Sequence, residues 1–256
     1  HKELIKGSAV LLIGFGIFNF IHFLFQLLLA RLLSVEEYGL LASVFVIVYI
    51  SSVFSESIQN FMVKYAAGEQ DGGKIKNLIK RITKKITKIC FIIIGIYLIA
   101  IIALSKLLDI DYGLLALAGF LLVLALFLPV TRGVMQGKKR FHSLSVNMII
   151  EALVKLGIGV GLVYLGFGVI GALVGVIFAG IIGFILSIYQ LKDIVRSEEK
   201  SIDIRNSYSY AWPTFCLTAV IVLFYSLDVW VARIFFSHNI SGSYAIASLL
   251  GKILFW

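Results

Sequence analysis

The chain has 256 residues, of which 60% are hydrophobic and 14% charged. A soluble domain carries roughly 45–50% apolar and about 25% charged residues, so this composition excludes an ordinary soluble domain and indicates a membrane protein. The net charge of +9 then predicts basic loops that face anionic lipid, rather than a protein that binds nucleic acid.

A membrane-spanning helix needs about 20 mainly apolar residues, and the chain contains a series of such segments. The predicted spans are 7–33, 38–65, 89–108, 112–136, 143–165, 168–191, 208–236 and 242–256. A basic stretch before the third span carries Ile75, Leu78, Ile82 and Ile86 at helical spacing, which predicts an amphipathic helix at the cytoplasmic surface. The fold class is therefore all-α, a polytopic bundle of transmembrane helices.

The distribution of Lys and Arg predicts the orientation of this bundle. Most of the 23 basic residues lie before the first span or between spans two and three, four and five, and six and seven. The opposite side has Arg31, Lys106 and Arg233. The positive-inside rule then predicts a multi-pass protein of the cell (plasma or inner) membrane with a cytoplasmic N-terminus. The outer loops are too short for a catalytic domain, so we expect no enzyme.

A loose internal repeat predicts the domain organisation. An Ala-Arg pair followed by Tyr, Ala and Ser occurs at 30–43 and again at 232–248. Six spans precede the recurrence, and an even number returns the chain to the same side, as in transporters built from two parallel repeats. We expect an N-terminal six-helix lobe at 1–192, a cytoplasmic linker at 193–207 and the start of a C-terminal lobe at 208–256, so that the chain is truncated.

Polar side chains inside the first two spans are candidate functional residues, because buried polar groups in a membrane are costly. Asn19, His22 and Gln26 share one face of the first span, where they either line a cavity or bond a neighbouring helix. His22 is a candidate proton site. In the second span, Ser52, Ser55, Glu56 and Gln59 form a polar stripe that we expect to face a cavity.

The later spans carry further candidates. Glu151 and Lys155 are four residues apart in the fifth span, either as a self-neutralised pair or as functional groups. In the fourth span, Pro129 predicts a kink, and Arg132 is either a ligand or an interfacial anchor. Asp228 in the seventh span is either functional or paired with Arg233.

Two features of the later sequence concern packing and metals. The sixth span has a row of small residues that predicts close helix packing, made of Gly171, Gly175, Ala179 and Gly183. The sequence contains no paired-Cys, HExxH or acidic metal motif. We therefore expect no metal site and no cofactor.

Three patterns together resemble a known family. They are Ala30-Arg31-Leu32-Leu33-Ser34 with Glu37-Tyr38-Gly39, then Arg132-Gly133-x-x-Gln136-Gly137 with Arg140-Phe141, and finally Asp228, Ala232-Arg233 and Gly242-x-Tyr244. In order and spacing they resemble the polysaccharide-exporting flippases (Wzx type) of the multidrug/oligosaccharidyl-lipid/polysaccharide exporter superfamily. The resemblance implies two six-helix lobes, of which the second is incomplete here.

The resemblance also implies a function. The expected cargo is a polyprenyl-diphosphate-linked oligosaccharide, flipped from the cytoplasmic to the outer leaflet by alternating access, with Na⁺ or H⁺ as a possible coupling ion. Expected partners are this cargo, membrane lipids and other polysaccharide-assembly membrane proteins. The candidate substrate-binding residues are Lys155, Arg31, Arg132, Asn19, Gln26 and Gln59, and the candidate ion-coupling residues are Glu56, Glu151, Asp228 and His22.

Two alternatives within the superfamily stay open. One is a multidrug/cation antiporter, and the other is a flippase for a peptidoglycan precursor. A cationic-drug exporter is expected to have an acidic, aromatic cavity, and a buried Lys155 argues mildly against it.

Overall fold

The computed structural model describes the backbone of residues 2–202 and 208–252 and the side chains of residues 7–202 and 215–252. The predicted linker residues 203–207 and the end of the last predicted span, 253–256, lie outside the described residues. The described chain contains helices and turns but no strand, which confirms the all-α prediction. The helices are α1 (Lys2–Leu32), α2 (Val35–Gly68), α3 (Gly72–Leu108), α4 (Tyr112–Leu124), α5 (Leu128–Gly137), α6 (Phe141–Leu162), the π-helical turn η1 (Val163–Phe167), α7 (Gly168–Gln190), α8 (Lys192–Arg196), α9 (Tyr208–Phe235) and α10 (His238–Lys252).

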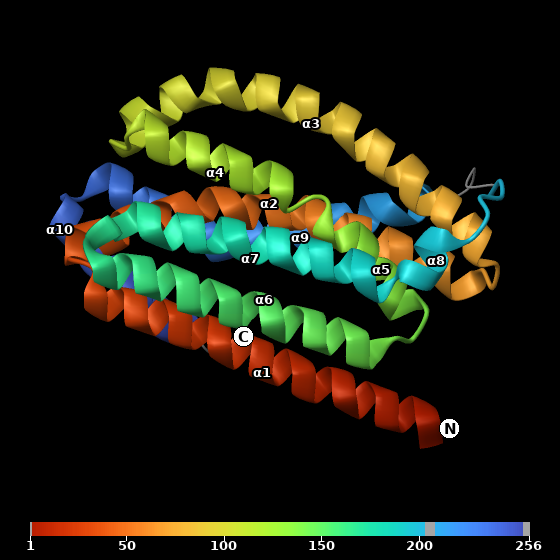
Figure 1. Cartoon of the computed structure of the whole chain (residues 1–256). Helices are drawn as coiled ribbons and strands as arrows, with labels where there is room; N and C mark the ends of the chain where they lie inside the picture. The colour runs from red at the N-terminus through yellow and green to blue at the C-terminus, as the bar shows by residue number, and fades with distance from the viewer. Residues whose placement is uncertain (1, 203–207, 253–256) are drawn as a thin grey trace.

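The long helices run side by side in one elongated bundle (Figure 1). The α2–α3 turn, the α5–α6 turn and α8 lie at one end, here called the linker end. The α1–α2, α3–α4 and α9–α10 turns and η1 lie at the other, here called the hairpin end. This arrangement follows from the alternating direction of successive spans.

Within the described residues, six helical stretches are long and apolar enough to cross a membrane. One of them, Phe141–Gln190, contains both α6 and α7. Gly166 of η1 and Gly168, the first residue of α7, have positive φ angles of 91° and 53°. Glycine adopts this backbone conformation without a steric penalty. The chain reverses there, and α6 and α7 pack against each other as two crossings. By contrast, α10 has 15 residues and is not among the six.

The predicted amphipathic helix and the third span form one continuous helix, α3, of 37 residues. Both predicted segments are therefore helical, and they join because the basic residues between them do not interrupt a helix and no Pro or Gly lies at the junction. At 1.5 Å per residue α3 is roughly 55 Å long, well beyond the ~30 Å hydrocarbon core. Its N-terminal half packs through Ile75, Leu78 and Ile82, and it arches along one side of the bundle (Figure 1).

The fourth predicted span is broken into α4 and α5 at residues 125–127. Pro129 has no N–H and so cannot donate to the carbonyl of Ala125, four residues earlier. In its place the Ser55 hydroxyl from α2 donates to the Ala125 carbonyl at 2.9 Å. The predicted kink is therefore confirmed, and the break is stabilised by a neighbouring helix.

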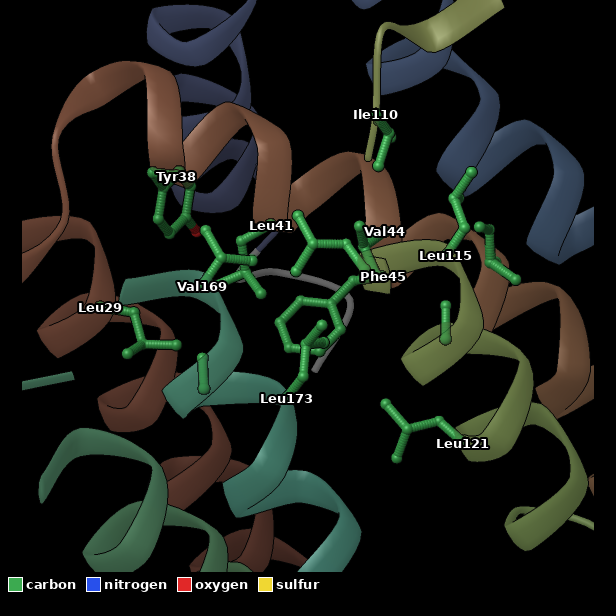
Figure 2. Packing of buried hydrophobic residues seen from close by; sticks show 14 of the residues in the cluster. Leu29, Tyr38, Leu41, Val44, Phe45, Ile110, Leu115, Leu121, Val169 and Leu173 are labelled. Carbon is green, nitrogen blue, oxygen red and sulfur yellow. The ribbon is translucent and has the colours of Figure 1, made fainter. Parts of the chain in front are cut away.

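Two apolar clusters form the core. The first lies toward the hairpin end and joins α1, α2, α4 and α7, as Figure 2 shows for Leu29, Leu41, Phe45, Leu115 and Leu173. The second lies toward the linker end and includes Met62, Ile75, Met135, Leu144 and Leu191. Helix α2 contributes to both clusters and also packs against α9 and α10, which makes it the central helix of the described fold.

The start of α10 is held tightly against the start of α2. A Cβ atom on Gly39 would lie 2.7 Å from the Cα of Gly242, and one on Gly242 would lie 2.1 Å from the carbonyl oxygen of Val35. Both glycines belong to motifs that carried the family resemblance, so backbone contact accounts for the residue type at both positions. The division into lobes at 192 and 208 stays a prediction.

Candidate functional site

The structure brings four predicted span residues together with Asn147. We call His22 of α1, Arg132 of α5, and Asn147, Glu151 and Lys155 of α6 the polar cluster. Asn147, Glu151 and Lys155 are spaced by four residues, so α6 presents all three side chains on one face. Asn147 and Lys155 are buried, and Arg132 and Glu151 are largely buried.

Within the polar cluster, Arg132 links α5 to α6. Its guanidinium forms an ion pair with Glu151 and donates through Nε to the Asn147 side-chain oxygen at 2.8 Å. Asn147 in turn donates to the carbonyl of Gly183 on α7 at 2.8 Å. The predicted alternative of a self-neutralised Glu151–Lys155 pair was wrong, because Arg132 from another helix reaches the Glu151 carboxylate.

Lys155 instead contacts α1. Its Nζ lies 2.8 Å from Nδ1 of His22 and 4.6 Å from the centroid of the Phe25 ring. An ammonium group over an aromatic face is stabilised by the ring quadrupole. The buried cation is therefore held by an imidazole and an aromatic ring, both of which are uncharged when His22 is neutral.

The charge of the polar cluster determines what it can bind. Arg132 and Lys155 are two cations, and Glu151 is the one carboxylate in the cluster. A net positive charge at low dielectric is costly unless an anion compensates it. The arrangement is therefore suited to an anionic group, since guanidinium and ammonium groups both bind phosphate oxygens well.

Close helix packing positions this cluster. A Cβ on Gly175 of α7 would lie 2.3 Å from the Cα of Gly159 on α6, and one on Gly14 of α1 would lie 2.3 Å from the Ser145 hydroxyl oxygen on α6. Glycine at these positions lets α1, α6 and α7 approach closely. The predicted role of the small-residue row in the sixth span is thereby confirmed.

A second group of polar residues lies where α2 meets α9 and α10. Here Glu56 accepts a hydrogen bond from Thr218 at 3.2 Å, and Glu56 itself is exposed. Nearby, Gln26 donates to Tyr49 at 3.4 Å, and the Tyr49 and Tyr225 rings meet edge to face. A cavity of about 60 Å³ lies between these helices.

Asp228 lies beside this cavity but does not pair with Arg233, so that predicted alternative was wrong. Its carboxylate accepts hydrogen bonds from Lys252 at 2.9 Å, from Tyr244 at 3.0 Å and from Ser248 at 3.1 Å. Sequence reasoning missed this partnership because Lys252 lies on another helix, 24 residues away. The available signal was a lysine inside an apolar span.

Arg31 lies away from the polar cluster, Gln59 bonds to a residue outside it, and Asn19 lies one turn before His22 on the same face of α1. Arg31 is exposed in the last turn of α1, nine residues and therefore roughly 14 Å along the helix from His22. Gln59 donates to Gln136 of α5 at 2.8 Å, and Asn19 is half-buried on α1. The predicted polar stripe of α2 thus has separate partners on α5, α9 and the α4–α5 break rather than one common site.

The side chains described by the structure include no group of three or more His, Cys, Asp or Glu residues that could hold a metal ion. The aromatic residues Tyr38 and Tyr225 and the cation Lys252 line the α2–α9–α10 cavity, and none of the three was predicted as a site residue. All three lie in apolar spans. A Tyr in such a span has no distinctive signature in a single sequence.

Comparison with known proteins agrees with this architecture. The family described as polysaccharide biosynthesis protein matches residues 4–254. A solved structure of a MOP (multidrug/oligosaccharidyl-lipid/polysaccharide) superfamily transporter from Pyrococcus furiosus matches with a TM-score of 0.59 and 15% identity, over 97% of this chain. This chain spans 60% of the length of that transporter. None of the curated proteins matches significantly.

These matches confirm the resemblance drawn from the sequence motifs. The structural likeness establishes a shared fold, and the family match covers nearly all of the chain. Together with the six apolar stretches, they establish a multi-pass membrane protein. The chain belongs to the polysaccharide biosynthesis protein family, within the fold of the MOP superfamily transporters.

Proposed function

We propose that the protein is a transporter, not an enzyme, that flips a polyprenyl-diphosphate-linked oligosaccharide from the cytoplasmic to the outer leaflet. The observation that carries the proposal is the polar cluster, in which Arg132 pairs with the one carboxylate and the buried Lys155 contacts an imidazole instead. A diphosphate would compensate the excess positive charge. Membership of a polysaccharide biosynthesis family supports the oligosaccharide part of the cargo.

In this proposal Lys155 and Arg132 bind the diphosphate. Lys155 would exchange its contact with His22 for a phosphate oxygen, and Arg132 would share its guanidinium between Glu151 and the cargo. The other predicted cargo residues, Arg31, Asn19, Gln26 and Gln59, would contact the glycan or line its route. Exposed Arg31 at the hairpin end would then act where the cargo leaves.

The charge of the polar cluster favours an anionic substrate. The related transporter from Pyrococcus furiosus is described as having a binding pocket of reverse polarity that suggests a different function. The substrate of the present chain must therefore be argued from its own residues, and these favour an anion over the cationic drug of an antiporter. A peptidoglycan-precursor flippase would share the diphosphate chemistry and differ in the glycan.

Orientation and coupling complete the proposal. Lys74, Lys80 and Lys84 lie in the N-terminal half of α3 at the linker end, so we place this end and the N-terminus in the cytoplasm of a cell-membrane protein. Exposed Glu56 is the best-placed carboxylate for a coupling Na⁺ or H⁺, since Glu151 and Asp228 already pair with cations. Other polysaccharide-assembly membrane proteins would receive the cargo.

The test is a flipping assay with the protein in liposomes. A fluorescent polyprenyl-diphosphate oligosaccharide is placed in one leaflet, and its protection from a membrane-impermeant quencher is followed. We expect flipping by the wild type, at least a tenfold slower rate for Lys155→Ala and partial rescue in Lys155→Arg. If the wild type instead leaves the lipid in place and exchanges a cationic dye for protons or sodium, the antiporter replaces our proposal.

A further inference from the structure

An apolar groove lies on the side of the bundle, between α2 and α3 and apart from the polar cluster. Its volume is about 210 Å³. The walls come from Phe54, Ile58 and Phe61 of α2 and from Ile86 and Ile93 of α3, with Leu126 at the α4–α5 break. Helix α3 arches over this side of the bundle (Figure 1). The lining therefore offers hydrocarbon side chains to whatever occupies the groove.

The groove exists because of two local features of the sequence. The helix break at residues 125–127 interrupts the surface that α4 and α5 would otherwise present, and Leu126 of that break lines the groove. Ser57 is a small residue in the wall, and its hydroxyl is used within α2, donating to the Val53 carbonyl at 2.9 Å. The hydrogen of the Ser57 hydroxyl is thus used within α2 and is not donated into the groove.

A cation lies toward the linker end of the groove. Lys85 belongs to the lining and is exposed, and Ile82 is the one lining residue of α3 that is closer to the linker end. From Lys85 to Ile93 is eight residues, or roughly 12 Å along the helix. That length is close to the ~15 Å of hydrocarbon in one leaflet, half of the ~30 Å core. A cation at the interfacial end and hydrocarbon below it match the two parts of an anionic lipid.

We propose that this groove is a binding site for an anionic phospholipid of the leaflet at the linker end. An acyl chain lies between α2 and α3, and the phosphate lies at Lys85. Charge complementarity distinguishes this lipid from a neutral one, because a lysine near the membrane surface attracts anionic lipid headgroups. The inference is independent of the cargo proposed above, since it uses none of the residues of the polar cluster.

The test uses the purified protein in nanodiscs that contain phosphatidylglycerol with a photoreactive group on its acyl chain. After illumination and digestion, mass spectrometry locates the attached lipid. We expect attachment to peptides covering 54–61 and 86–93, at least fivefold stronger than with the matching phosphatidylcholine probe. Lys85→Ala and the groove-filling Ser57→Phe should each lower this attachment at least fivefold.

The matched control is Lys84→Ala, which removes an exposed lysine from the same helix without altering the groove lining. Attachment in this variant should equal that of the wild type, and elution as a single species by size exclusion verifies the fold of each variant. Equal attachment of the two lipids, or equal losses in Lys84→Ala and Lys85→Ala, would overturn the proposal. So would displacement of the probe by equimolar polyprenyl phosphate, which would assign the groove to the cargo.

Discussion

The contact between Ser55 and the α4–α5 break allows a quantitative prediction. Ser55→Ala removes the donor to the Ala125 carbonyl, which Pro129 leaves without a helical partner. An unsatisfied buried acceptor costs roughly 1–3 kcal/mol in water-soluble proteins, and hydrogen bonds between membrane helices average about 0.6 kcal/mol. For this half-buried site we expect a loss of about 1 kcal/mol in the free energy of unfolding.

A double-mutant cycle isolates the cause. In Pro129→Ala the new N–H can donate to the Ala125 carbonyl, so the Ser55 hydroxyl becomes dispensable, and Ser55→Ala should cost less than half as much in that background. The assay is unfolding by SDS, followed by circular dichroism. Ser52→Ala is the matched control, because the Ser52 hydroxyl donates to the Tyr49 carbonyl within α2. If Ser55→Ala costs the same with and without Pro129, the reasoning is refuted.

Three further predictions concern packing, the hairpin end and the linker end. Gly175→Val inserts side-chain atoms against the Gly159 backbone, and this overpacking should lower the unfolding free energy by about 1–3 kcal/mol in the same SDS assay; an unchanged midpoint would contradict the observed close packing. Arg233 donates to the carbonyls of residues 108 and 109 at 3.0 and 3.2 Å, so Arg233→Leu should speed amide hydrogen exchange in the α3–α4 turn, and unchanged exchange would argue against this link. The pKa of Asp71 is lowered because its carboxylate accepts hydrogen bonds from Lys200 and a backbone N–H. The stability that these bonds contribute is present at neutral pH and is lost as the pH falls below about 4 through the lowered pKa. Pepsin should therefore cut the segment at 197–202 faster as the pH falls from 5 to 2, whereas Asp71→Asn should be cut rapidly across that range, and parallel pH profiles would contradict this.

The helical elements were predictable because their causes are local. Apolar runs of about 20 residues identify spans, and the small-residue row of α7 predicted close packing against another helix, which the structure shows to be α6 at Gly159. The kink at Pro129 follows from its missing N–H. The length of α3 was harder to predict, because its basic half and its apolar half have different environments but the same backbone conformation.

The polar partners were not predictable because they depend on how separate helices align. Glu151 and Lys155 have favourable spacing on one helix, yet the structure gives them partners on α5 and α1. The same holds for Asp228, which bonds to Lys252 on α10 rather than to nearby Arg233. A single sequence indicates which residues are costly to bury and does not specify the interhelical register that satisfies them.

In the proposed mechanism, the excess positive charge of the polar cluster binds the diphosphate of a lipid. The most direct measurement is the affinity of the detergent-solubilised protein for a polyprenyl diphosphate, determined by native mass spectrometry for the wild type, Lys155→Gln and Glu151→Gln. Removing a cation should weaken binding at least tenfold, whereas removing the carboxylate should leave it equal or stronger, because the net charge changes in opposite directions. Equal affinities for all three proteins, or a loss in Glu151→Gln as large as in Lys155→Gln, would contradict the account.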